Sequence, residues 1–291
     1  SSAASDVYKR QQLIVILLGF LSRRVLIYSV GVEYLGINGL MSNILTIFSL
    51  AESGIGLAIG YALYKPLAEN DIEQVKSLMR FFKYTYRALA IGTAAIGIAF
   101  YPLLPFFLKN NTAPDANLVY WLFLLGSVSS YLWVYKTTLN TSDQNKYLYT
   151  IASTIAQIVV LVLKVLILYF AQNYILYLAV DIGTTIVKNL IFCRIVDRRY
   201  PYLKDKNVRK LDPEVRKSLF TNIKALFLGK VGYIISQCSD NLVISSLVSV
   251  TAVGMYSNYT TLITSVSGFV TTFSLSLIHI SEPTRRSYIS Y

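Results

Sequence analysis

Apolar segments long enough to cross a bilayer follow one another along almost the whole chain. A helix needs about 20 apolar residues to span the hydrocarbon, and eight segments meet that length: 12–31, 38–63, 81–108, 117–140, 147–171, 174–195, 218–247 and 251–274. Only 14% of the residues are charged, whereas soluble domains carry roughly 25%. The sequence therefore predicts an all-α, polytopic membrane protein with about eight transmembrane helices.

Both ends of the chain match translations of sequencing-adapter DNA. The opening SSAASDVYKRQ and the later stretch LSLIHISEPTR are peptides that the two partner adapters of a transposase library encode. We therefore expect residues 1–11 and 275–291 to be adapter-derived, and 12–274 to be an interior piece of a longer protein. His279, the one histidine of the chain, falls in the second of these segments.

Lysine and arginine gather in alternate joints between the apolar segments. The joints after the second, fourth and sixth segments hold most of them, while the other joints hold only Lys109. Cytoplasmic loops carry the excess of these residues, which predicts a multi-pass protein whose natural N-terminus is cytoplasmic. Topology and anionic lipid headgroups also explain the net charge of +12, so nucleic acid is not an expected partner.

The sequence gives little support for soluble catalysis or metal binding. Cys193 and Cys238 are the only cysteines, and the expected natural insert lacks histidine, so we predict packing cysteines, no metal and no cofactor. GIGLAIG, residues 54–60, lacks the spacing of a dinucleotide loop. Its Gly56 and Gly60 instead predict a small-residue surface where helices approach closely. No Walker phosphate loop occurs, and we expect a protein that is not an enzyme.

Polar side chains inside the apolar segments are the candidate functional residues. Lipid cannot hydrate them, so they should face the bundle interior or a water-filled cavity. In the seventh segment, Lys230, Tyr233, Gln237 and Asn241 share one helix face, which Asp240 borders. The full set of charged positions is Arg23, Arg24, Glu52, Lys164, Asp181, Lys188, Lys230 and Asp240.

Structural roles are the alternative for each of these positions. The two adjacent arginines could form bridges with Glu52 or Asp240. Lys164 and Lys188 could extend along their helices to the membrane interface, as long basic side chains do. Asp240 and its neighbour Asn241 could cap or anchor the outer end of the seventh segment.

Two stretches carry a resemblance to a known family. GVEYLGINGLMSNILTIFSLAESGIGLAIGYALYKPLAENDIEQVKSLMRFFKYTYR, residues 31–87, resembles the first helices and first cytoplasmic loop of bacterial oligosaccharide flippases. QCSDNLVISSLVSVTAVGMYSNYTTLI, residues 237–263, resembles the seventh helix of the same family and its turn into the eighth. These Wzx-like polysaccharide transporters belong to the superfamily that also contains multidrug and toxic compound extruders.

The resemblance implies a two-bundle transporter of the bacterial cytoplasmic membrane. Residues 12–216 would be the first six-helix bundle with its basic linker, and 217–274 the truncated start of the second bundle. Such proteins carry undecaprenyl-diphosphate-linked oligosaccharide from the inner to the outer leaflet by alternating access. Their partners would be this lipid-linked substrate, membrane lipids, and the polymerase and glycosyltransferases of polysaccharide synthesis.

The resemblance also suggests roles for the polar residues. Related flippases place cavity arginines in the first helix, where Arg23 and Arg24 lie. The candidate headgroup ligands are Arg23, Arg24, Lys164, Lys230, Gln237 and Asn241, and the candidate coupling-ion residues are Glu52 and Asp240. Two alternatives remain open: a cation-coupled multidrug exporter of the same superfamily, and a membrane polysaccharide polymerase or glycosyltransferase.

Overall fold

The computed structural model describes residues 19–108, 115–205 and 208–288, and these residues form helices and short turns with no strand. The expected adapter segment 1–11 lies outside the described residues, as do the side chains of residues 271–288. The all-α prediction is confirmed for the described part of the chain.

Helices follow one another closely along the chain. Residues 19–30 are helical. They are followed by α2 (Val32–Phe48), α3 (Leu50–Ala68), α4 (Ile72–Phe100), α5 (Leu104–Phe107), α6 (Ala116–Tyr131), α7 (Val134–Ser142), α8 (Lys146–Phe170), α9 (Tyr174–Arg199), α10 (Pro213–Leu247) and α11 (Val250–Tyr288). Short 3-10 turns, η1 (Tyr101–Leu103) and η2 (Pro201–Lys204), join α4 to α5 and extend α9.

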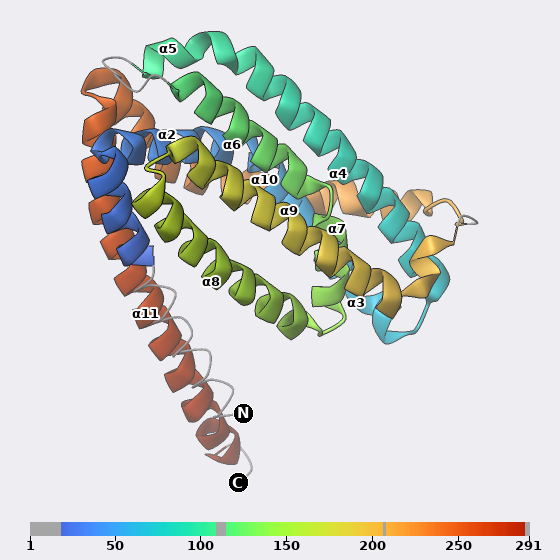
Figure 1. Cartoon of the computed structure of the whole chain (residues 1–291). Coiled ribbons are helices and arrows are strands. Elements are labelled where there is room, and N and C mark those ends of the chain that lie inside the picture. Colours follow the sequence, from blue (N-terminus) through green and yellow to red (C-terminus); the bar gives the residue numbers. More distant parts are fainter. Residues whose placement is uncertain (1–18, 109–114, 206–207, 289–291) are drawn as a thin grey trace.

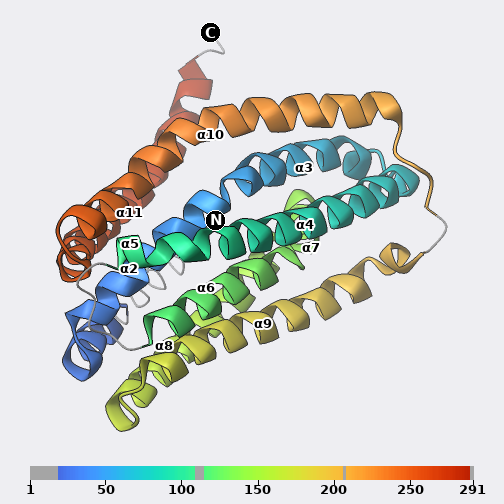
Figure 2. The same ribbon diagram turned by 90° about the horizontal axis from the view of Figure 1, so that it is seen from above.

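The helices pack in an order that differs from their order in the chain. Helix α10 runs along α3 and α2, and α11 lies against α2 and the helical residues 19–30 (Figures 1 and 2). Helix α4 follows on the other side of α3, then α6, then α9, with α8 packed on α9. Residues near the start of the chain therefore lie beside residues more than 200 positions later.

Several helices are long and apolar enough to cross a membrane. They are the continuous stretch Ile72–Phe107, Tyr149–Phe170 of α8 and Tyr174–Arg199 of α9. A fourth candidate is the pair α6 and α7, which are bent by 43° at the break between them. The structure thus supports a membrane protein with three or four such spans, and the count of eight stays a prediction.

The expected spans 38–63 and 117–140 are not continuous helices. The first is interrupted at Ser49, and the second at residues 132 and 133. A hydroxyl group bonds back to its own helix at each break: Ser49 donates to the carbonyl of Thr46, and Ser130, just before the second break, donates to that of Ser127. Serine and threonine that bond back in this way often bend a helix, which is consistent with both interruptions.

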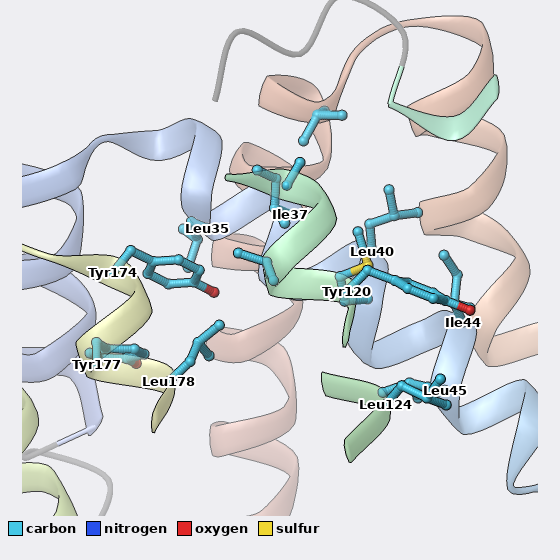
Figure 3. Close-up of a cluster of buried hydrophobic side chains, with 14 of the residues drawn as sticks. Leu35, Ile37, Leu40, Ile44, Leu45, Tyr120, Leu124, Tyr174, Tyr177 and Leu178 are labelled. Carbon is cyan, nitrogen blue, oxygen red and sulfur yellow. The ribbon is translucent and has the colours of Figure 1, made fainter. Parts of the chain in front are cut away.

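The larger buried cluster joins α2, α6 and α9 (Figure 3). Leu35 and Leu40 of α2 pack with Tyr120 of α6 and with Tyr174 and Leu178 of α9 (Figure 3), all buried. Buried tyrosine hydroxyls need partners, and Tyr120 donates to the carbonyl of Gly97 over 2.6 Å. The cluster holds the central helices in register around the candidate site.

Close helix contacts occur at glycines other than the two we predicted. A Cβ at Gly36 would collide with the carbonyl oxygen of Val250, and one at Gly54 would lie 2.9 Å from that of Ile223. At Gly56 and Gly60, by contrast, the nearest atoms are side-chain hydroxyls at 3.3 and 3.7 Å. Gly56 and Gly60 thus contact α4 and α7 through side-chain hydroxyls, and Ser142 of α7 donates to the carbonyl of Gly60 over 3.4 Å, whereas the tightest approach of backbones occurs at Gly36 and Gly54.

Beyond the end of α9, a polar cluster ties the α7–α8 joint to η2. Tyr200 donates to Asp143 over 2.6 Å, and Arg199 donates to Asn145 over 2.9 Å. Burial, reinforced by the hydrogen bond to Asp143, raises the pKa of Tyr200 to about 12. The phenol therefore stays protonated at neutral pH and keeps this connection between the two joints.

Candidate functional site

Arg23 is held by a polar strip of α11. Its guanidinium donates to the side chains of Ser257, Asn258 and Thr261, with a distance of 2.9 Å to the threonine hydroxyl. All three partners are neutral, so the positive charge of Arg23 is hydrogen-bonded but not neutralised by them. A charge in this condition favours a nearby anion.

Arg24 has a different environment although it is the next residue. Its side chain is exposed, and its guanidinium carbon lies 5.7 Å from the centroid of the Tyr28 ring. Arg24 shares an outer, largely apolar hollow with Arg23, Asn258 and Leu262. Only Arg23 also reaches the inner cavity described next.

Two hollows of the bundle share Asn38 as a lining residue. The first, of about 290 Å³, is lined by Arg23, Asn38 and Tyr177 among others. The second, of about 310 Å³, is lined by Asn38, Ser42 and Asp181 together with serines of α6. Polar side chains therefore line two hollows that share Asn38, one that includes the arginine and one between α2, α6 and α9.

Lys164 and Asp181 form an ion pair at the second of these hollows, which Asp181 lines. Their Nζ and Oδ2 atoms are 2.9 Å apart, and the same Nζ lies 4.4 Å from the centroid of the Tyr177 ring. The Lys164 side chain is only 11% exposed, whereas that of Asp181 is 44% exposed. The carboxylate thus opens onto the cavity while the ammonium stays behind it. We call Arg23, Lys164, Asp181 and the two cavities at Asn38 the interior site.

Glu52 lies in a separate polar cavity of about 440 Å³. This cavity is lined by Glu52, Gly56, Gly60, Tyr86 and Thr138, among others. Two of our predicted features, the carboxylate and the glycine pair, therefore belong to one hollow between α3, α4 and α7.

The predicted stripe of the seventh segment is divided in the structure. Lys230 is exposed, while Asn241 is buried and donates to the carbonyl of Gly39 over 3.5 Å. The side chain of Gln237 lies outside the described part of the molecule. Asp240 is exposed and accepts a hydrogen bond from Tyr256 over 2.7 Å. Of the described side chains, those of Lys230, Asp240 and Asn241 are not among the residues that line the two hollows at Asn38.

Several residues of the interior site were not among our candidates. Tyr177, Asn38 and the α11 partners of Arg23 are neutral, and single polar residues are frequent in such segments. A signal was nevertheless present: Ser257, Asn258 and Thr261 recur at a spacing that places them on one face of a helix. The structure also places Lys188 near Tyr149, with 3.5 Å between Nζ and the phenol oxygen.

Comparison of the chain with known protein families, with characterised proteins and with solved structures found no match. Within the described residues, no group of three or more His, Cys, Asp or Glu side chains is placed to hold a metal ion. The chemistry of the site therefore has to be inferred from its geometry. A cationic, hydroxyl-lined hollow within an apolar bundle can bind an anionic, hydroxylated group and keep it away from lipid.

Proposed function

We propose that the chain is part of a bacterial flippase for undecaprenyl-diphosphate-linked oligosaccharide. The observation that carries this proposal is the state of Arg23, whose guanidinium is held by neutral side chains and opens onto a polar cavity. Arginine binds phosphate oxygens through its planar fork and does not lose its charge. The resemblance of residues 31–87 and 237–263 to this family supports the same function.

The physical need for such a protein is clear from the substrate. Each unpaired hydroxyl that enters hydrocarbon costs roughly 4–8 kcal/mol, so a sugar headgroup does not cross lipid by itself. A polar path through the bundle removes most of this cost if the lipid tail stays outside. Side chains such as Asn38, Ser42 and Tyr177 offer hydrogen-bonding partners along that path.

In this proposal the described helices form the first bundle and the opening of the second, with alternating access between bundles in the bacterial cytoplasmic membrane. The close contact of Gly36 with Val250 joins α2 to α11, and Arg23 bonds to α11 at the same seam. Movement of α11 would therefore alter the partners of Arg23. Glu52 and Asp240 remain our candidates for a coupling ion, and Lys230, Gln237 and Asn241 for headgroup contacts made with helices beyond residue 274.

An exporter of cationic drugs is the competing function. Such a protein is expected to place carboxylates in excess around its cavity. The interior site instead has two cations, Arg23 and Lys164, and one carboxylate, Asp181, which is already paired with Lys164. This balance favours an anionic ligand.

Binding of a short prenyl diphosphate tests the proposal. The purified chain in lipid nanodiscs would be titrated with farnesyl diphosphate, with farnesol as the uncharged control and ethidium as a cationic drug. We expect binding of the diphosphate, weakened by about 10- to 100-fold in Arg23→Gln, because a hydrogen bond to a charged group contributes about 1.5–3 kcal/mol. The matched control, Arg24→Gln, should change the affinity by less than about threefold.

Three results would count against the proposal. Equal affinity for farnesol and farnesyl diphosphate would show that the charge is not recognised, and equal loss in the two arginine variants would show that Arg23 has no special position. Binding of ethidium in preference to the diphosphate would favour the exporter. Circular dichroism and size-exclusion chromatography of each variant separate loss of binding from loss of fold.

A further inference from the structure

A further polar cavity lies away from both the interior site and Glu52, at the end of the bundle where α4 begins and α9 ends. Figure 1 shows these two helix ends side by side. The cavity has a volume of about 580 Å³, within the range of about 300–1,000 Å³ that is typical of small-molecule sites. Its walls come from α4, α7, the end of α9 and η2, and we call it the interfacial pocket.

Cations outnumber carboxylates in the interfacial pocket. Of the described residues that line it, five are basic, Lys76, Arg80, Lys83, Lys136 and Lys204, and two are acidic, Asp197 and Asp205. They come from the three basic joints that follow the second, fourth and sixth apolar segments of the sequence. The fold therefore collects at one place the charges that the sequence distributes among three loops.

Each of the two carboxylates forms an ion pair with a lysine whose side chain is little exposed. Lys136 pairs with Asp197 at 2.7 Å, and Lys76 pairs with Asp205 at 3.0 Å and with Glu73. These two lysine side chains are only 14% and 8% exposed. They form the neutralised inner wall of the pocket, and the remaining charge is carried by its more exposed cations.

Arg80, Lys83 and Lys204 are the exposed cations of the pocket. On α4, Lys76, Arg80 and Lys83 lie four and seven residues apart and thus share one helix face, where like charges repel. Arg80 donates to the carbonyl oxygen of Val208 over 3.4 Å, a neutral partner. An anion bound between these side chains would relieve the repulsion.

Helix length places the pocket at the membrane surface. The stretch Ile72–Phe107 has 36 residues, about 54 Å of helix, whereas the hydrocarbon is about 30 Å thick. Residues 88–107 carry no charge, so they suit the hydrocarbon, and residues 72–87 extend beyond it. Tyr84, at the edge of the pocket, is exposed, and tyrosine is typical of the interface between membrane and water.

We propose that the interfacial pocket binds a phosphate group, in the form of an anionic phospholipid headgroup or of free phosphate. Arginine and lysine are the side chains that recognise phosphate oxygens, and anionic lipid headgroups are available beside basic pockets on the cytoplasmic side of a membrane. The inference does not depend on transport. It uses residues that are separate from the interior site, so either proposal can fail alone.

The test is a titration of the purified chain in a neutral detergent by isothermal calorimetry. The probes are dihexanoyl phosphatidylglycerol, dihexanoyl phosphatidylcholine and inorganic phosphate. We expect one saturable site for an anionic probe, weakened by about tenfold or more in the double variant Arg80→Gln/Lys83→Gln. The control Lys65→Gln/Arg198→Gln removes the same two charges from exposed positions on α3 and α9 and should leave the affinity unchanged.

The probes distinguish the two sources of phosphate. Saturable binding of phosphatidylglycerol that excess phosphate does not displace identifies a lipid headgroup site, and binding of inorganic phosphate with equal affinity identifies a site for the free anion. Binding of neither anion, or equal binding of phosphatidylcholine, would overturn the proposal. Equal weakening in the control double variant would overturn it as well. The single variant Lys204→Gln removes a cation of the pocket that lies on η2 instead of α4, and it should also weaken binding of the anionic probe.

Discussion

The interior site and the interfacial pocket differ in how far their charged side chains are paired. In the interior site, Lys164 is paired with Asp181 and Arg23 is bonded by three polar side chains. In the interfacial pocket, by contrast, five cations surround two carboxylates. Unpaired charge is expensive where water is scarce and cheap near the membrane surface. The interior site therefore holds few charges beyond those that would contact a ligand, whereas the pocket at the membrane surface can hold more.

Removal of one partner of the interior ion pair should have the largest effect. Asp181→Asn leaves the ammonium of Lys164 buried without its counter-ion, so we expect a loss of about 3 kcal/mol in the free energy of unfolding. Thermal unfolding of the purified chain in detergent measures it. The double variant Lys164→Met/Asp181→Leu removes both charges and should recover most of the stability. If Asp181→Asn is as stable as the parent, the pair does not bear on stability.

The contact between α2 and α11 should affect only the interior site. Gly36→Ala places a Cβ against the carbonyl of Val250, and overpacking of this kind costs about 1–3 kcal/mol. We expect weaker binding of farnesyl diphosphate and unchanged binding of phosphatidylglycerol. Gly92→Ala is the matched control, since no atom lies within 4 Å of its Cβ. Equal effects of the two alanines would contradict the packing that joins α2 to α11.

Salt should separate the two sites in the next experiment. Exposed charges are screened strongly and buried ones much less. Between 0.01 and 0.5 M salt we therefore expect a roughly tenfold loss of affinity at the interfacial pocket and a smaller loss at the interior site. Titrations of both probes over this range provide the comparison. A stronger salt effect at the interior site would mean that its cavity is open to bulk solvent.

The smallest predicted effects are those of ion pairs near the surface. Lys136→Gln leaves the carboxylate of Asp197, which is 30% exposed near the membrane surface, without its counter-ion and should cost about 1 kcal/mol. Lys65→Gln breaks an exposed pair with Glu69 at 4.0 Å and should cost about 0.2 kcal/mol. Urea titrations of both variants measure the order. A larger loss in Lys65→Gln than in Lys136→Gln would mean that the Lys136–Asp197 pair in the wall of the interfacial pocket contributes less to stability than an exposed pair does.

The sequence predicted helix positions well where apolar runs are bounded by turn residues. The expected segments 147–171 and 174–195 begin within one residue of α8 and α9. The expected end of the first segment, near residue 31, falls at Gly31, whose φ of 98° suits glycine. The interruptions at Ser49 and Trp133 were not predicted. They depend on hydroxyl groups bonding back to the helix, and the same residue types also occur in unbroken helices.

The candidate site was predicted only in part, because it depends on which helices become neighbours. Arg23, Lys164 and Asp181 were visible in the sequence as charges in apolar segments. The partners of Arg23 lie more than 230 residues away on α11, and although they share one helix face, the sequence does not show which helix that face contacts. The structural alternative paired the arginines with Glu52 or Asp240, and the structure provides Ser257, Asn258 and Thr261 as the side-chain partners of Arg23.

The interior site requires a hollow at Asn38, beside Arg23, that a ligand can enter from water. Cysteine labelling tests it most directly, in a chain whose buried Cys193 and Cys238 are replaced by alanine. A charged, membrane-impermeant maleimide should label Asn38→Cys and should not label Ile91→Cys on the exposed, apolar face of α4. Farnesyl diphosphate, but not farnesol, should protect the Asn38→Cys variant from labelling. Absence of labelling at position 38, or labelling that the diphosphate does not slow, would contradict the account.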